Sequence, residues 1–227
     1  MPLKRILEPE VMDTTEEAAD YDAMDHADVN RVFVDDLLAF LQFSDASEAD
    51  LRVLDVGTGT AQIPIELCRR NLPTHVTGVD LAAEMLKLGC ENVAAAGLTA
   101  RIDLELIDAK QLPYAAGTFD VVMSNSIVHH IPDPSLVVAE MARVVCYGGV
   151  LFIRDLLRPD NQTEVERLVD SYAGGANEHQ RQLFRQSLHA ALTVSEMQSL
   201  LVAAGLPASW CRQTTDRHWT IAGRCGV

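Results

Sequence analysis

The stretch Val53-Leu54-Asp55-Val56-Gly57-Thr58-Gly59-Thr60-Ala61 decides the fold. Its first four residues are those of a buried strand, and the two glycines make a turn that leads into a helix. Glycines at this place let backbone N–H groups approach a ligand, and the amino end of the following helix adds partial positive charge. We therefore expect a ligand-binding loop between a strand and a helix.

Two side chains beside this loop separate two ligand classes. A dinucleotide-binding loop has glycine or alanine three residues after its second glycine, so that helix and strand pack closely, but Gln62 stands there. Asp55 precedes the first glycine by two residues, and its carboxylate would repel a pyrophosphate and attract an ammonium group. The sequence therefore disfavours an NAD-dependent reductase and favours a nucleotide that carries an amino acid.

Outward from the loop, short runs of branched apolar residues alternate with longer helical stretches. This alternation is typical of a parallel sheet with crossover helices. A tight turn separates the last two apolar runs, which predicts a hairpin that adds an antiparallel edge. We expect parallel strands at residues 52–56, 75–79, 102–107, 119–124 and 149–154, and the hairpin strands at 209–215 and 218–222.

Residues 13–42 are predicted to form two acidic helices. Asp13 and Glu16 have the spacing of a capping box, and Asp28 is placed to cap the second helix. The second helix has apolar residues that recur on one face, namely Val29, Val32, Phe33, Leu37, Leu38 and Leu41. We expect residues 1–50 to form an acidic helical cap.

Two further helices are expected in the second half of the chain. Asp133 followed by Pro134 begins a helix that runs to about residue 145, before two glycines at 148–149 end it. Thr193 and Glu196 form a capping box for a helix that Gly205 ends.

Between these helices, residues 160–192 form the least regular stretch, which two glycines at 174–175 interrupt. We interpret this stretch as an insertion or lid over the substrate site. It belongs to a single predicted domain of residues 51–227.

Acidic residues follow three successive strands. Asp80 ends the second strand, at the position from which a carboxylate accepts from both hydroxyls of a ribose. Asp108 follows the third strand, where a carboxylate can accept from the amine of a purine. Together with Asp55 they fit one adenosine-based ligand across the sheet.

In this order, the motifs resemble those of the class I S-adenosylmethionine-dependent methyltransferases, and in particular the small-molecule type related to the ubiquinone and menaquinone methyltransferases. The resemblance covers about residues 51–158, and more weakly 193–222. It implies a Rossmann-like, doubly wound, seven-stranded sheet, mostly parallel, and S-adenosylmethionine as cofactor. The chain departs from the family pattern at Ala61, where a third glycine is often found, and at residues 146–147, where a basic residue and proline are common.

The resemblance also implies which residues bind the cofactor. Three residues of the glycine loop surround the methionine part of the cofactor, and Asp55 supports that loop. Two further residues hold the ribose, and two hold the adenine. They are Gly57, Thr58 and Gly59 for methionine, Asp80 and Leu81 for ribose, and Asp108 and Ala109 for adenine, with Asn125, Tyr21 and Met85 as further contacts.

The implied reaction is an in-line displacement at the sulfonium methyl group, in which the protein aligns the partners and removes a proton where the acceptor needs it. The candidate acceptor site lies at the carboxyl ends of the fourth and fifth strands. Its catalytic candidates are His129, His130 and Asp155, and its substrate-binding candidates are His26, Arg154, Tyr172 and His218. The alternatives are a helix-entry turn at the two histidines and a salt-bridged strand end at residues 154–155.

Composition narrows the partners. The formal charge is −15, and 14 acidic against three basic residues in the first 50 supply −11 of it. Such a chain lacks the basic footprint that nucleic acids and anionic membranes require, so we expect a small-molecule acceptor. No apolar run is long enough to span a membrane, and we expect a cytoplasmic protein without integral membrane association.

The five cysteines are widely spaced, so we expect neither disulfides nor a structural zinc site, and no metal among the site residues. A protein that binds S-adenosylmethionine or S-adenosylhomocysteine without transferring a methyl group, as a sensor or partner, remains the alternative to an enzyme.

Overall fold

The computed structural model describes residues 3–8, 13–22, 27–41, 50–70 and 72–226. Its strands are β1 (Leu51–Val56), β2 (Thr74–Asp80), β3 (Ile102–Leu106), β4 (Phe119–Asn125), β5 (Val145–Leu156), β6 (Cys211–Gln213) and β7 (His218–Arg224). Its helices are α1 (Thr15–Asp22), α2 (Ala27–Leu41), α3 (Gln62–Cys68), α4 (Ala83–Ala95), α5 (Ser135–Val144), α6 (Gln162–Ala173), α7 (Glu178–Ala190) and α8 (Val194–Ala203). Single 3₁₀ turns are η1 (Val128–His130) and η2 (Ala208–Trp210).

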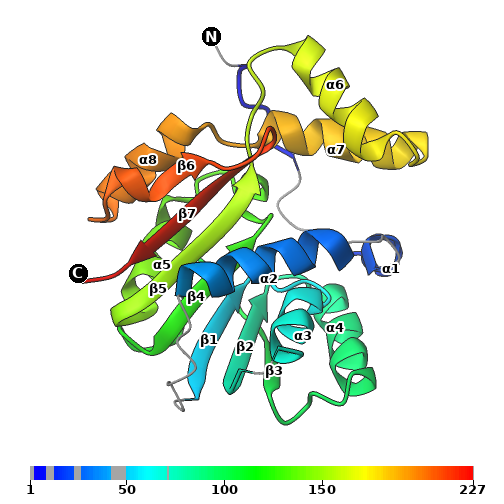
Figure 1. Ribbon diagram of the computed structural model, residues 1–227. Helices are drawn as coiled ribbons and strands as arrows, with labels where there is room; N and C mark the ends of the chain where they lie inside the picture. Colours follow the sequence, from blue (N-terminus) through cyan, green and yellow to red (C-terminus); the bar gives the residue numbers. More distant parts are fainter. Residues whose placement is uncertain (1–2, 9–12, 23–26, 42–49, 71, 227) are drawn as a thin grey trace. The chain divides into compact units, whose positions relative to one another are not determined.

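The described strands form a seven-stranded sheet in the order β3-β2-β1-β4-β5-β7-β6 (Figure 1). Strand β1 pairs in parallel with β2 and β4, β2 pairs in parallel with β3, and β6 pairs antiparallel with β7. This order confirms the predicted Rossmann-like, mostly parallel sheet with an antiparallel hairpin at its C-terminal edge. Among the described residues, no helix combines the length and apolar character that a membrane crossing needs.

The chain divides into two compact units, which we describe separately. Unit 1 comprises the described parts of residues 1–10, 126–135 and 154–221, and unit 2 comprises the described parts of 11–125, 136–153 and 222–227. The predicted boundary at residue 50 and the predicted lid remain predictions.

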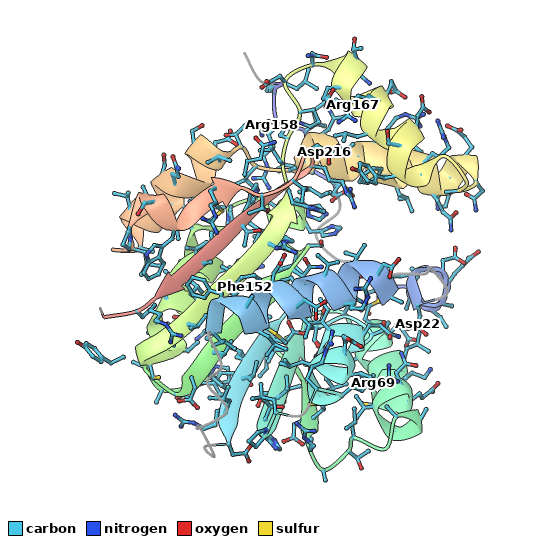
Figure 2. All side chains as sticks on the ribbon, viewed as in Figure 1. Asp22, Arg69, Phe152, Arg158, Arg167 and Asp216 are labelled. Carbon is cyan, nitrogen blue, oxygen red and sulfur yellow. The ribbon has the colours of Figure 1, made fainter. Side chains whose placement is uncertain are left out.

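The core of unit 2 is the apolar interior of the first strands and the helices against them. Phe33 of α2 meets Phe152 of β5 edge to face, with ring centroids 5.3 Å apart (Figure 2). Leu54 of β1 is fully buried, which contributes roughly 1.5–3 kcal/mol relative to an exposed side chain. The central strands are therefore a rigid base for the loops at their carboxyl ends.

Helix α2 buries most of the predicted apolar face. Phe33, Val34 and Leu37 are its buried residues, whereas Val29 and Val32 are exposed. The acidic residue at position 28 does not cap the helix, since it lies within the first turn and pairs with Arg31 at 2.9 Å. The prediction is therefore confirmed for Phe33 and Leu37, with Leu38 and Leu41 packed against the core, and wrong for the two valines.

The capping box predicted for α1 is wrong. The Asp13 carboxylate accepts instead from the backbone N–H of Glu84 at 3.0 Å, and so caps α4. The hydroxyl of Thr15 donates to the Glu84 carboxylate at 3.0 Å, in the same region. The segment before α1 thus satisfies the amino end of a helix about 70 residues later.

Strand β5 begins at Val145, directly after α5, so the glycines at 148–149 do not end a helix but lie within the strand. A Cβ at Gly149 would lie 2.9 Å from the backbone oxygen of Asp120, so the close approach of this backbone requires glycine. At the other end of α5, the Asp133 carboxylate accepts from the N–H of Ser135 at 3.0 Å, as predicted for a cap.

In unit 1, residues 160–192 are more regular than predicted. Asn161 and Asn177 cap α6 and α7 with their side chains, and Arg185 of α7 pairs with Glu166 of α6 at 3.0 Å. The predicted capping box of α8 is confirmed, because Thr193 and Glu196 accept from each other's backbone N–H groups.

Candidate functional site

The glycine loop after β1 has an unusual backbone. Gly57, Gly59 and Ala61 have φ angles of 75°, 54° and 62°, in the left-handed region. For Ala61, a residue with a Cβ, this conformation is uncommon and tends to occur at functional loops. The N–H groups of Gly57 and Thr58 donate to the carbonyl of Val79 at 2.8 and 3.0 Å. The loop is therefore held against the end of β2.

Asp80, at the end of β2, connects the glycine loop after β1 to the turn after β2. Its Oδ2 accepts from the N–H of Gly59 at 2.8 Å and its Oδ1 accepts from the N–H of Ala82 at 2.9 Å. Each carboxylate oxygen thus meets one backbone donor and retains acceptor capacity. Burial raises the pKa of Asp80, although the two N–H groups favour its charged form.

Asp55 is only 2 % exposed at the end of β1. Burial raises the pKa of its carboxyl to about 7. In the loop that follows, the hydroxyl of Thr60 is buried and has no hydrogen-bond partner among the described residues. The loop therefore holds polar groups whose interactions the folded chain alone leaves incomplete.

The end of α1 lies on this loop. The Tyr21 ring is 3.9 Å from the place of a Cβ on Gly59, and Asp22 accepts from Gln62 at 3.1 Å and from Asn92 at 2.9 Å (Figure 2 labels Asp22). The contact of Tyr21 with the cofactor stays a prediction. Sequence reasoning missed the bonds from Gln62 and Asn92 to Asp22, since nothing in the spacing of these residues links α1 to α3 and α4.

The other predicted cofactor residues of unit 2 differ in exposure. Leu81 is 40 % exposed after β2, whereas Met85 is buried and packs with Ala18 and Ala82. Asp108 is half-exposed and accepts from the N–H of Lys110 at 2.9 Å. Partly exposed positions are also found for Ala109 and for Asn125, the last residue of β4.

Unit 1 brings together the three predicted catalytic residues. His129 Nδ1 lies 2.5 Å from Asp155 Oδ1, and both side chains are buried. The Asp155 carboxylate also accepts from the backbone N–H groups of Val128 at 2.6 Å and Leu156 at 2.6 Å. Burial opposes the charged forms, but mutual attraction lowers the pKa of Asp155 and raises that of His129.

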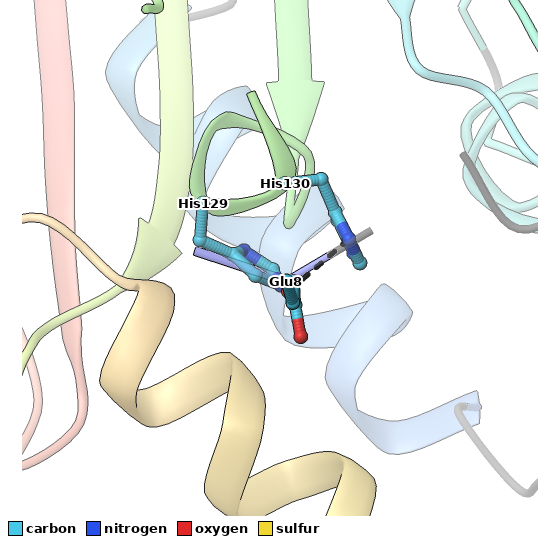
Figure 3. A group of neighbouring side chains, drawn as sticks. All are labelled: Glu8, His129 and His130. Atoms are coloured by element: carbon cyan, nitrogen blue, oxygen red, sulfur yellow. Dashed lines mark ion pairs between the residues drawn. The ribbon is translucent and has the colours of Figure 1, made fainter. Parts of the chain in front are cut away.

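Sequence reasoning missed Glu8, which completes this cluster (Figure 3). Its Oε1 lies 3.1 Å from His130 Nδ1 and 3.4 Å from His129 Nε2, and its Oε2 accepts from the hydroxyl of Ser187 at 3.2 Å. Glu8 is 121 residues from His129 in the chain, and no motif signals the pairing.

Arg5 was also missed. Its guanidinium donates to four backbone carbonyls, those of Ala190 at 2.6 Å, Ile131 at 2.9 Å, Pro132 at 3.0 Å and His129 at 3.1 Å. These bonds fix residues 129–132 and, through the same backbone, the segment that carries Glu8. The helix-entry turn considered from the sequence is present, but it is stabilised from the N-terminal segment.

Three of the predicted substrate-binding residues, Arg154, Tyr172 and His218, lie in unit 1. Arg154 is buried, and its Nε donates to Thr220 at 3.1 Å. The Tyr172 hydroxyl donates to Asp216 at 2.9 Å, and Arg167 pairs with Asp216 at 3.0 Å (Figure 2).

Burial lowers the pKa of His218 to about 4, so this imidazole is neutral near pH 7. His26 lies outside the described residues.

The turn after β4 contains a second left-handed residue with a side chain. Ser126 has a φ of 60°, and its N–H donates to the carbonyl of Arg154 at 2.9 Å. Backbone strain is thus found at two loops, after β1 and after β4, and at no other described residue with a Cβ.

A family model described as a methyltransferase domain matches residues 54–153, from β1 to β5. Residues 54–153 belong to the class I S-adenosylmethionine-dependent methyltransferases. The match includes the glycine loop, Asp80 and the strand before Ser126.

Relatives differ in how much of this chain they match. The demethylmenaquinone methyltransferase of Porphyromonas gingivalis is 39 % identical over 109 residues, 47 % of this chain and 44 % of the relative. The 27-O-demethylrifamycin SV methyltransferase of Amycolatopsis mediterranei is 31 % identical over 175 residues, 75 % of this chain and 60 % of the relative. The chain thus covers about half of the length of these curated relatives.

A solved S-adenosylmethionine-dependent methyltransferase from Aquifex aeolicus has the same fold. It superposes with a TM-score of 0.66 at 16 % identity, and the match covers 94 % of this chain and 99 % of that one.

The residues of this methyltransferase domain fit the cofactor of the family, S-adenosylmethionine. Asp80 retains acceptor capacity for hydroxyl groups, the partnerless Thr60 hydroxyl lies within the loop, and the exposed Leu81 offers an apolar surface. The fit therefore rests on both polar and apolar groups of unit 2.

The substitution Gly78→Ala in β2 is expected to disturb the glycine loop. A Cβ at position 78 would lie 2.7 Å from Thr58 Oγ1 and 2.8 Å from Leu104 Cδ2. Relieving this overlap is expected to cost about 1–3 kcal/mol of unfolding free energy. Urea denaturation measures it, with Gly175→Ala as the control, because a Cβ at Gly175 meets no atom within 4 Å. Equal losses in both variants would contradict the prediction.

Proposed function

We propose that this protein transfers the methyl group of S-adenosylmethionine to a small-molecule acceptor and releases S-adenosylhomocysteine. The observation that carries the proposal is the pair of hydrogen bonds that Asp80 accepts. Its carboxylate accepts from the N–H of Gly59 in the glycine loop and from the N–H of Ala82. Further support comes from the relatives from Porphyromonas gingivalis and Amycolatopsis mediterranei, a demethylmenaquinone methyltransferase and a 27-O-demethylrifamycin SV methyltransferase.

In this proposal, unit 2 binds the cofactor along the ends of β1, β2 and β4 and the loop after β3. Asp55 attracts the ammonium group, because a carboxyl whose charge burial disfavours gains most from a nearby cation. Asp80 accepts from the ribose hydroxyls, and Asp108 accepts from the adenine amine. The remaining proposed contacts are Tyr21, Gly57, Thr58, Gly59, Leu81, Met85, Ala109 and Asn125.

When bound, S-adenosylmethionine supplies a methyl group that its sulfonium already activates. The residues of the chain then need to hold the cofactor and the acceptor in line and to exclude water. In this view, fixing the loop by Asp80, Asp22 and Asn92 matters more for rate than any single acid or base.

The acceptor is proposed to meet residues at the carboxyl ends of β4 and β5, where open α/β sheets bind ligands. His129, His130 and Asp155 are the catalytic candidates, and His26, Arg154, Tyr172 and His218 the substrate-binding ones. Neither histidine is an isolated base, since His129 contacts Asp155 and both contact Glu8. The cluster therefore suits orientation of an acceptor better than simple proton removal.

The proposal predicts that S-adenosylhomocysteine accumulates when the protein is incubated with S-adenosylmethionine and a panel of phenols, carboxylic acids, amines and thiols. Mass spectrometry of the cofactor product measures it, and the Asp80→Asn variant is the negative control. If calorimetry shows binding of S-adenosylmethionine but no acceptor yields product, the protein is a sensor or partner and not an enzyme. Binding of NAD⁺ in place of S-adenosylmethionine would refute both readings.

A further inference from the structure

Three side chains of metal-ligating type converge in unit 1. They are Glu8 from the N-terminal segment and His129 and His130 from η1, and one ligand atom of each lies within 4.8 Å of the other two (Figure 3). We propose that Glu8, His129 and His130 bind a divalent first-row transition-metal ion, with Zn²⁺ as the ion that suits the ligands best. The site does not depend on the proposed methyl transfer.

The two distances from the Glu8 carboxylate to the histidines are those of ligands around one small cation. Tetrahedral zinc with bond lengths of about 2.0–2.1 Å places neighbouring ligand atoms about 3.3 Å apart. The Oε1 of Glu8 lies 3.1 Å from His130 Nδ1 and 3.4 Å from His129 Nε2. The Oε1 atom is buried, and neither imidazole meets it with hydrogen-bond geometry. Ligand atoms that lie this close to one another without forming hydrogen bonds fit a metal ion bound between them.

The surrounding groups already orient two of the three ligands. Asp155 lies 2.5 Å from His129 Nδ1 and accepts backbone N–H groups, so it is a carboxylate that directs the proton of His129 to Nδ1. Nε2 of His129 then presents its lone pair toward Glu8. Ser187 donates to the Oε2 of Glu8 at 3.2 Å and leaves Oε1 to face the histidines. A carboxylate behind a ligating histidine is the usual arrangement in zinc sites.

The burial of the three ligands also suits a bound cation. The side chains of Glu8 and His129 are 8 % and 4 % exposed, and their facing atoms lie 3.4 Å apart. With His130 as the third ligand, one atom of each side chain lies within 4.8 Å of the other two, so a single metal ion can accept an electron pair from all three.

Two imidazoles and one carboxylate are the ligand set of zinc sites that retain an open coordination position. The expectation from the sequence, that no metal is bound, considered the cysteines and could not include Glu8. We assign Glu8, His129 and His130 as ligands and Asp155 as a positioning residue.

Zinc binding tests this assignment without cofactor or acceptor, so its failure leaves the proposed methyl transfer untouched. Protein without an affinity tag is freed of metal with a chelator and titrated with ZnCl₂ in a calorimeter. One ion is expected to bind with a Kd below about 10 µM. Glu8→Gln is expected to weaken binding by at least about 100-fold, and Asp155→Asn by about 10- to 100-fold.

His179→Ala is the matched control, because His179 is an exposed histidine on α7 of the same unit and its loss is expected to leave the affinity unchanged. Circular dichroism checks that each variant is folded. Should Glu8→Gln not fold, His130→Ala tests the same site, since the ring of His130 is 23 % exposed and tolerates removal more easily. Equal zinc affinity in parent and ligand variants, or a Kd above about 1 mM in the parent, would overturn the site.

Discussion

Asp80→Asn is expected to weaken binding of S-adenosylhomocysteine by at least about 100-fold. The carboxylate accepts from Gly59 at 2.8 Å and from Ala82 at 2.9 Å, so it orders the glycine loop and the start of α4 at once. In the proposed complex it also accepts from the ribose. A hydrogen bond to a charged group contributes about 1.5–3 kcal/mol. The loss of one bond to the loop and one bond to the ribose accounts for the expected change in affinity.

The asparagine variant keeps the shape of the side chain but replaces one acceptor oxygen with an NH₂ donor. That donor would face a backbone N–H, so one of the two loop bonds is lost before any ligand binds. Isothermal calorimetry measures the affinity. The control is Asp103→Asn, because Asp103 is an exposed residue of β3 that pairs with His75 at 2.8 Å. Affinities for Asp80→Asn within fivefold of the parent would show that the ribose lies elsewhere.

Local patterns predicted the part of the molecule that depends on local interactions. The run from Val53 to Ala61 combines a buried strand with a glycine turn that leads into a helix, and the structure has all three. The capping box of Thr193 and Glu196 involves residues three apart in one helix. Such features are encoded within a few neighbouring residues, so the sequence alone shows them.

Contacts between residues far apart in the chain could not be predicted from the spacing of residues in the sequence. Asp13 has the pattern of a cap for its own helix, yet it caps α4 because tertiary packing brings the N–H of Glu84 to it. Glu8 and Arg5 lie outside every regular element, although Arg5 binds four carbonyls and Glu8 completes the histidine cluster. The candidate site was therefore predicted where it follows strands and missed where it uses the N-terminal segment.

The contribution of Asp55 to stability is expected to be lost as the pH rises from about 4 to about 7. Burial raises the pKa of Asp55 to about 7 from an ordinary value of 3.8. Below pH 4 the carboxyl is protonated in both the folded and the unfolded chain. Between pH 4 and 7 only the unfolded chain releases the proton, so the contribution to stability is lost progressively until the folded pKa is passed.

The loss between pH 5 and pH 8 is expected to be roughly 3 kcal/mol larger in the parent than in Asp55→Asn, because the asparagine does not titrate. Urea denaturation of both proteins at both pH values measures this double difference, in which the other titrating groups cancel. The control variant is Asp103→Asn, which removes an exposed carboxyl and is expected to follow the parent. A double difference below about 1 kcal/mol would show that Asp55 is ionised in the folded protein at neutral pH.

The same carboxyl links stability to ligand binding. If the ammonium group of the cofactor lies near Asp55, it favours the carboxylate and lowers its pKa, so binding releases a proton near pH 7. The affinity of the parent for S-adenosylhomocysteine should then increase from about pH 6 to about pH 7.5, while that of Asp55→Asn should not. An equal change of affinity with pH in both proteins would show that the ammonium group does not lie near Asp55. The buried acid would then be a structural feature of the loop, held protonated by its surroundings rather than kept ready for a cationic ligand.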